Sequence, residues 1–211
     1  MNRQHTIFVS LLVILTVAIV ATGYAKGWGP LGVLTVGISR LTYGKQSGLV
    51  AETEAAAAPE ISSGFWINSE PLKLKSLRGR VVLIEFWTFG CFNCRNTLPS
   101  IKKWDARYRD KGLTVIGVHS PEFDEEKKID HLRREVTELG IQYPVVSDND
   151  YATWSSYGVH AWPTLFVLDK QGRVRWKHVG EGAYDETEEV IKKLLEEEEL
   201  RGDTSESKTE R

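Results

Sequence analysis

The pattern of hydrophobic and polar positions changes its period near residue 90. From 81 to 87 the chain is apolar and rich in β-branched and aromatic side chains, apart from Glu85, which predicts a buried strand. Beyond residue 91, apolar side chains recur in steps of three and four and so share one face of a helix: Leu98, Ile101, Trp104 and Tyr108. The chain therefore passes from a core strand into a helix through a turn that contains Gly90.

Further elements follow along the chain. Strands are predicted at 113–118, 144–147, 165–168 and 173–178, and helices at 125–139, just after 148–150 and around 190–195. This alternation indicates an α/β domain. The leucines at 72 and 74 predict one more short strand. In the segment 173–178, apolar side chains alternate with Arg173, Arg175 and Lys177, so these three cations are expected to face solvent.

An uncharged apolar segment of the N-terminal region covers residues 7–25, which is long enough to cross a bilayer as a helix. We predict a transmembrane anchor there, while Gly23-Tyr24-Ala25 keeps a cleaved signal segment open. Arg3 is the only cation before the segment, and Lys26 follows it, so the charges do not favour an N-terminus inside. The domain boundaries predicted are a polar start (1–6), the anchor (7–25), a linker (26–64), the folded domain (65–195) and an acidic, disordered tail (196–211).

Charge and cysteine content narrow the chemistry. A formal net charge of −2 offers no basic field for nucleic acid. The chain has only 2 cysteines, and both lie in the Cys91-x-x-Cys94 motif at the predicted helix start. Unpaired N–H groups and the helix dipole favour a negative sulfur there. We predict that Cys91 is the nucleophile and that Cys94, one turn into the helix, is the more buried resolving thiol. A zinc site, which needs about four ligands, and an inert disulfide are the alternatives.

The motif resembles those of thioredoxin-fold oxidoreductases of the TlpA/ResA class, and most of all the thioredoxin-like domain of DipZ-type proteins. The resemblance rests on a W-T-x-x-C-x-N-C-x-x-x-x-P pattern that begins at Trp87 and ends at Pro99, together with the segments 117–123, 148–154, 162–163 and 180–182. It covers about 65–195. It implies a central mixed sheet flanked by helices, with an inserted helix–strand unit before Trp162.

The resemblance also implies the other site residues. Pro163 is expected to form a cis peptide bond with Trp162 and to pack against the two cysteines. Glu85 interrupts an apolar strand, so we expect a raised pKa or a polar partner. As the buried acid of related proteins, it would handle the proton of Cys94, which makes Glu85 the third catalytic residue; an acid facing solvent at a strand edge is the alternative. We expect the substrate-binding surface to comprise Trp87, Phe92, Asn93, Trp162 and Pro163.

The implied activity is disulfide exchange with protein thiols on the extracytoplasmic side of a membrane, without a bound cofactor or metal. A membrane dithiol donor would supply electrons. The Phe92-Asn93 dipeptide adds no positive charge beside Cys91, which favours a reductant, and cytochrome c maturation is the substrate class that the resemblance suggests.

Two other activities remain open. Thr88, three residues before Cys91, matches part of the peroxiredoxin motif, although Ile84 stands where that motif has proline. The chain would then be a thiol peroxidase. A copper-binding module would use the two cysteines with His119 or His160. A single histidine at the end of a strand, as His119 is, more often orders a loop.

Overall fold

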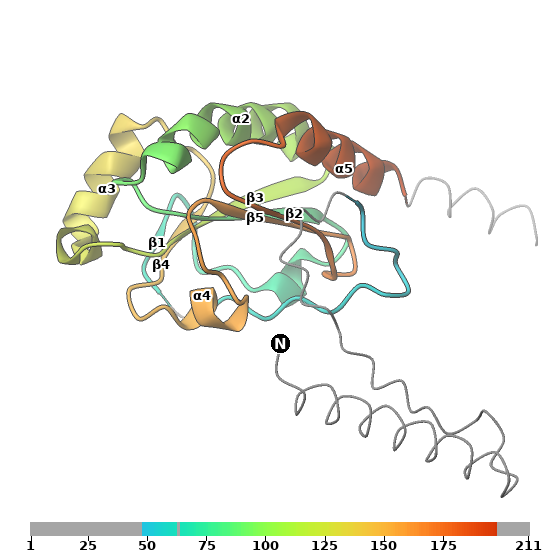
Figure 1. The fold of residues 1–211 in the computed structure, drawn as a ribbon, viewed down its shortest axis with the longest axis horizontal. Coiled ribbons are helices and arrows are strands. Elements are labelled where there is room, and N and C mark those ends of the chain that lie inside the picture. Colours follow the sequence, from blue (N-terminus) through green and yellow to red (C-terminus); the bar gives the residue numbers. More distant parts are fainter. Residues whose placement is uncertain (1–47, 63, 198–211) are drawn as a thin grey trace, which may run out of the picture. The chain divides into compact units, whose positions relative to one another are not determined.

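The computed structural model of the chain describes residues 48–62 and 64–197. Within this part, the strand predicted at 81–87 is β2 (Val81–Trp87), a central strand of a 6-stranded sheet with the order β1-β4-β3-β2-β5-β6 (Figure 1). The other strands are β1 (Trp66–Ile67), β3 (Leu113–His119), β4 (Val145–Ser147), β5 (Thr164–Leu168) and β6 (Val174–Val179). β2 pairs in parallel with β3 and antiparallel with β5, so the mixed sheet is as predicted.

Helices cover both faces of the sheet. They are α2 (Phe92–Tyr108), α3 (Ile129–Glu138), α4 (Ala152–Ser156) and α5 (Tyr184–Glu196), with short 3₁₀ helices η1 (Leu74–Leu77), η2 (Arg109–Lys111) and η3 (Asp124–Lys127). Figure 1 shows α2 and α5 over one face and α4 below the other. The strand predicted around 72–74 is wrong. The carboxylate of Glu60 accepts the N–H groups of Leu74 and Lys75 and so caps η1 there instead.

Alternation along β2 divides the core between the two faces. Val81, Leu83 and Trp87 pack with the apolar sides of α2, α3 and α5. The residues between them, Val82, Ile84 and Phe86, pack on the other side with Leu74 and Tyr157. Because successive strand residues point to opposite faces, Glu85 lies on the same side as Val81, Leu83 and Trp87. The one acidic residue of β2 therefore points toward the helix that carries Cys94.

Residues 50–62, called the N-terminal arm below, belong to the domain. Val50 donates its N–H to the Arg175 carbonyl, Val174 donates to Ala56, and Ala58 donates to Gly172. The arm thus supplies backbone partners to β6, an edge strand whose outer polar groups would otherwise be unpaired. Residues 50–62 of the predicted linker (26–64) are therefore part of the folded domain and not a free tether. Residues 26–47, the predicted span at 7–25 and the tail from 198 lie outside the described residues.

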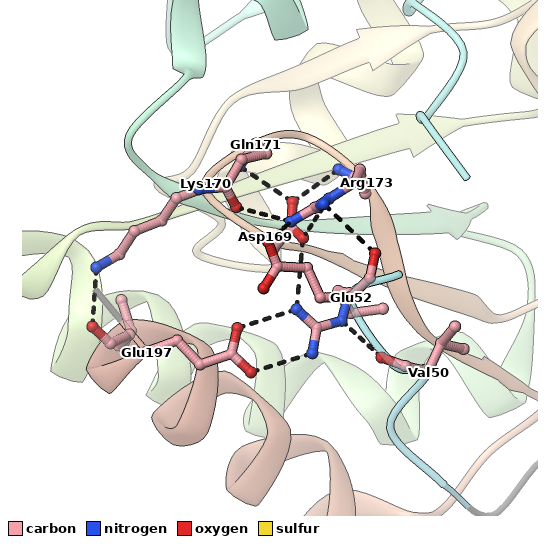
Figure 2. Close-up of polar contacts among 9 residues, drawn as sticks. Val50, Glu52, Asp169, Lys170, Gln171, Arg173 and Glu197 are labelled. Atoms are coloured by element: carbon pink, nitrogen blue, oxygen red, sulfur yellow. Dashed lines mark hydrogen bonds and ion pairs between the residues drawn. The ribbon is translucent and has the colours of Figure 1, made fainter. Parts of the chain in front are cut away.

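A buried ionic network joins the arm, β6 and the end of α5 (Figure 2). Arg175 is only 3% exposed, which contradicts its expected place on a solvated face. Its guanidinium donates to the Val50 carbonyl at 2.6 Å and to both oxygens of Glu197 at 2.9 and 3.0 Å. The carboxylate of Asp169, 2% exposed, lies 3.4 Å away. A buried guanidinium needs such partners, and local alternation along the sequence does not reveal them.

No helix in the described part of the chain is both long and apolar enough to cross a membrane.

Candidate active site

The two cysteines lie where the turn after β2 leads into α2. Cys91 is the N-cap residue of α2, and its sulfur accepts the N–H of Cys94 at 3.2 Å. Cys91 is partly exposed, whereas Cys94 is fully buried; both are free thiols. The relative exposure predicted for the two sulfurs is therefore confirmed. A partner disulfide can reach Cys91, and only Cys91 can reach Cys94 within the helix turn.

The Cys94 thiol is strongly disposed to keep its proton. Burial raises the pKa of Cys94 above its ordinary value, and the hydrogen bond with Cys91 raises it further. A smaller contribution in the same direction comes from the negative charge of Glu85. Since the thiolate is the species that attacks a disulfide, Cys94 needs a group that removes its proton before it can resolve a mixed disulfide.

Glu85, the acid expected to handle this proton, interacts electrostatically with Cys94. Its side chain is fully buried, and burial raises its pKa to about 8. The Tyr143 hydroxyl donates a hydrogen bond of 3.0 Å to Oε2 and partly offsets the effect of burial. Both expectations for Glu85, a raised pKa and a polar partner, are thus confirmed. An acid with a pKa of about 8 exchanges protons readily near neutral pH.

The predicted cis bond lies just before β5. The Trp162–Pro163 peptide is cis, and Pro163 is buried. Gly180 donates its N–H to the Pro163 carbonyl at 2.7 Å, which ties the loop after β6 to the start of β5. The Trp162 indole donates to the Ser120 carbonyl at 2.9 Å and packs against Trp154, with ring centroids 4.4 Å apart. These contacts fix the side chain of Trp162 while leaving it partly exposed.

The predicted substrate-binding residues differ in their access to solvent. Phe92 is 75% exposed, and Asn93 beside it is also exposed, so both can meet a partner at the helix start. Trp87 has no exposed surface, and its ring packs against His119 at a centroid distance of 5.5 Å. The expectation that Trp87 contacts substrate is therefore wrong. As the last residue of β2, it fills the core beneath the turn.

Sequence reasoning missed a second buried acid beside the dithiol. Glu126 in η3 is 4% exposed, and its Oε2 accepts the Thr88 hydroxyl and the Glu122 N–H, both at 2.6 Å. The Thr88 hydroxyl also lies 3.2 Å from Nε2 of His119. Thr88 in turn touches the dithiol, because its carbonyl accepts the Cys91 N–H, and its backbone lowers the pKa of Cys94.

His119 occupies a position suited to ordering the loop, because its Nε2 lies 3.2 Å from the Thr88 hydroxyl. It is fully buried, and burial lowers its pKa to about 3, so it is neutral. The sequence predicts a helix around Glu126, but it does not predict that the Glu126 side chain is buried. The helix predicted at 125–139 would leave Glu126 among its solvated charges, whereas the structure has η3 and α3 there, and η3 turns the Glu126 side chain inward. In the described part of the chain, no three His, Cys, Asp or Glu side chains converge as a metal site would require.

Known proteins are similar in sequence to this domain. The model of the AhpC/TSA family fits residues 56–177. Protein DipZ of Mycobacterium tuberculosis is 44% identical over 133 residues, which are 62% of this chain and 19% of DipZ. The thiol-disulfide oxidoreductase ResA of Bacillus anthracis is 29% identical over 128 residues, covering 61% of this chain and 71% of ResA. The chain thus spans about a fifth of the DipZ proteins that it matches.

A solved structure agrees with the sequence relatives. The crystal structure of a thioredoxin-like superfamily protein is 30% identical, covers 68% of this chain and 98% of its own, and superposes with a TM-score of 0.64. The family match includes β2, both cysteines, Glu85 and Pro163. The chain therefore belongs to the AhpC/TSA family, and its described domain is a thioredoxin-like domain.

Proposed function

We propose that this chain is a membrane-tethered oxidoreductase that exchanges disulfides with protein substrates on the extracytoplasmic side of a membrane. The observation that supports it best is the unequal pair of thiols. Cys91 is accessible at a helix N-terminus, and Cys94 is buried behind it on the face of the sheet that holds Glu85. This arrangement separates a thiol that meets the partner from a thiol that finishes the reaction.

The reaction proceeds in two exchanges. The Cys91 thiolate attacks one sulfur of a substrate disulfide, forms a mixed disulfide, and releases the other substrate sulfur as a thiolate. Glu85 accepts the proton of Cys94, and the Cys94 thiolate then attacks Sγ of Cys91. The bond between Cys91 and the substrate breaks, and the substrate sulfur leaves with the electron pair and takes up a proton. Two electrons pass to the substrate, and Cys91 and Cys94 become a disulfide.

The direction proposed is reduction of the substrate. A strong oxidant has a stabilised reduced form. Here, burial raises the pKa of Cys94, and no basic side chain stands between the two cysteines. The reduced form therefore gains little from charge stabilisation and gives up its electrons readily. Disulfides of apocytochrome c, reduced during cytochrome c maturation, are the substrate class that we propose.

The proposed function places the domain at a membrane. Residues 7–25 serve in it as the anchor, and a membrane dithiol protein re-reduces Cys91 and Cys94 after each cycle. One relative, ResA of Bacillus anthracis, is a thiol-disulfide oxidoreductase, which supports the proposed chemistry. The proposal needs no cofactor, because the electrons move between sulfur atoms alone.

The test is a trapping experiment with Cys94→Ser. Without the resolving thiol, Cys91 should remain joined to its substrate, and the adduct should run as a larger species that dithiothreitol releases. Identifying the adducts from the outward-facing leaflet of the host membrane gives both substrate and side. The control is Cys91→Ser/Cys94→Ser, which should trap nothing. Adducts formed only with cytoplasmic proteins would overturn the location, and the absence of any Cys91 adduct would overturn the activity.

Two further measurements separate the alternatives. Turnover of hydrogen peroxide by the purified chain at a rate above its reduction of protein disulfides would favour a thiol peroxidase. Stoichiometric copper that survives dialysis would favour a metal carrier. We expect neither result, since the Thr88 hydroxyl is engaged by Glu126 and the His119 Nε2 faces Thr88.

A further inference from the structure

The carboxylate of Glu85 has two chemically different oxygens. Oε2 accepts the Tyr143 hydroxyl at 3.0 Å. Oε1 is buried and has no hydrogen-bond partner among the described residues. An unpaired carboxylate oxygen in the core costs stability, so its retention calls for a reason. Glu85 interacts electrostatically with Cys94 on the same side of the sheet, and a carboxylate oxygen with a free lone pair suits the role of proton acceptor.

Tyr143 reaches Glu85 across a gap that one glycine provides. On β3 the residue directly opposite Glu85 is Gly117, and Gly117 also pairs with Val145 of β4. A Cβ at Gly117 would lie 3.2 Å from Cε2 of the Tyr143 ring and 2.9 Å from Nε1 of Trp87. The missing side chain therefore leaves room for the Tyr143 ring, whose hydroxyl contacts the acid from beyond the neighbouring strand. Tyr143 itself has no exposed surface.

We propose that Tyr143 is a positioning residue for disulfide exchange: its hydroxyl holds Oε2 of Glu85, so that Oε1 remains free to take the proton of Cys94. This inference rests on the proposed function of Glu85. The hydroxyl does its work by orienting the carboxylate and by stabilising its charged form. The tyrosine neither donates nor receives the transferred proton, and it makes no contact with substrate, since it is buried.

The electrostatic surroundings are consistent with that role. Glu85 is flanked by Gly117 on β3 and Leu165 on β5, neither of which titrates. The titratable groups that act on it from packed elements are Cys94 of α2 and Tyr143. Asp105 of α2 acts on Tyr143, whose pKa is raised mainly by burial and also by Glu85. The Tyr143 hydroxyl therefore remains a donor throughout the neutral range.

The test follows two thiol reactions in the reduced full-length chain with the chromogenic disulfide DTNB. Attack by Cys91 releases the first coloured thiolate, and attack by Cys94 on the resulting mixed disulfide releases the second. Tyr143→Phe removes only the hydroxyl. It should leave the first phase unchanged and slow the second about tenfold near neutral pH, because a hydrogen bond to a charged group is lost. The midpoint of the pH profile of the second phase should move upward by about one unit, since the charged form of Glu85 loses its donor.

The matched control is Tyr157→Phe. Tyr157 is also buried and its hydroxyl also makes one hydrogen bond, to the Pro59 carbonyl, but it lies on the opposite face of the sheet. It should leave both phases unchanged. Glu85→Gln should flatten the pH profile of the second phase. The double variant Tyr143→Phe/Glu85→Gln should then match Glu85→Gln alone, because Tyr143 acts only through the carboxylate.

The outcomes separate this inference from the proposed function. A normal profile for Tyr143→Phe together with a flat one for Glu85→Gln would overturn the role of Tyr143 and leave Glu85 in place. A normal profile for Glu85→Gln would remove both roles while leaving the dithiol chemistry intact. Further slowing of the double variant beyond Glu85→Gln would mean that Tyr143 acts by a route independent of the acid, which also contradicts the inference.

Discussion

The hydroxyl of Thr88 donates a hydrogen bond of 2.6 Å to Oε2 of Glu126, although 38 residues separate the two in sequence. Thr88 belongs to the turn that carries Cys91, and Glu126 belongs to η3 on the loop after β3. The same oxygen accepts the Glu122 and Phe123 N–H groups. One buried carboxylate thus fastens a surface loop to the turn of the active site.

Glu126→Gln should lower the free energy of unfolding by about 2 kcal/mol. The neutral amide of glutamine accepts hydrogen bonds from the Thr88 hydroxyl and the two backbone N–H groups less well than the carboxylate does. Thr88→Val should cost about 1 kcal/mol, and the double variant should cost less than the sum, since the two residues share a bond. Urea unfolding measures all three. Glu125→Gln, an exposed neighbour in the same 3₁₀ helix, is the control and should change little. Full additivity would mean that the bond does not couple loop and turn.

The raised pKa of Glu85 predicts that the stability of the fold depends on pH. In the unfolded chain a glutamic acid has a pKa of about 4.5, and in the folded chain the pKa of Glu85 is about 8. Between these values the folded state holds more protons, so the stability contributed by Glu85 is complete below 4.5 and is lost as pH rises toward 8. Glu85→Gln should therefore make the protein more stable at pH 8, by several kcal/mol at about 1.4 kcal/mol for each unit of the window.

Thermal unfolding of Glu85→Gln and the wild type at pH 5 and pH 8 provides the measurement. The stability difference between them should grow with pH across the window. A difference that does not change with pH would mean that Glu85 titrates normally in the fold, in contradiction to its complete burial.

The contribution of His119 to stability should depend on pH in the opposite direction. Its pKa falls from 6.5 to about 3 on folding, so the unfolded state holds more protons between these values. Its contribution to stability is present above 6.5 and is lost as the pH falls toward 3. His119→Gln should flatten the acid side of the stability curve, as urea titrations at pH 4 and pH 7 would show. An equal loss of stability on acidification in the variant would assign the acid sensitivity to other groups.

Gly117→Ala should destabilise the fold by about 1–3 kcal/mol, because the added methyl group would press on the Trp87 indole and the Tyr143 ring. It should also disturb the contact between Tyr143 and Glu85, and hence the second phase of the reaction with DTNB. Gly48→Ala is the matched control, since nothing lies near its added Cβ. Equal stability of the two variants would show that the core beside β3 has room to spare.

Arg175→Met should cost about 3 kcal/mol, because it leaves the carboxylates of Asp169 and Glu197 without their shared cation. It should also increase protease cleavage within the N-terminal arm, whose Val50 carbonyl loses a donor. Lys192→Met, an exposed substitution on α5, is the control. Unchanged cleavage of the arm would indicate that its backbone bonds to β6 suffice to hold it.

Much of the site could be predicted because its signals are local. A buried strand, a Cys-x-x-Cys turn and a helical period lie within 81–108, and together they predict which thiol is exposed. The acid in β2 shows itself by breaking an apolar run. The cis bond before Pro163 was implied only by the family resemblance, and the structure confirms it.

The errors concern residues whose surroundings come from distant segments. Alternation in β6 gives the face of Arg175, but its burial depends on the arm and on Glu197, which sequence periodicity cannot place. Glu126 appeared to be an ordinary helix charge, because its partner Thr88 lies on another element. Trp87 was expected at the surface because it belongs to the motif, yet the period of β2 already places it with the core residues Val81 and Leu83.

The arm joins β6 at the end far from the dithiol. Val50 bonds to Arg175 beside the Leu168 end of β5, whereas Gly180 bonds to Pro163 at the other end. Immobilising the domain on a solid support through residue 48 would therefore leave Cys91 pointing into the solution, ready to capture thiol partners from a flowing extract. Coupling through the Phe92 side would block access to Cys91. Domain immobilised through residue 48 should therefore capture more thiol partners than domain immobilised beside Phe92.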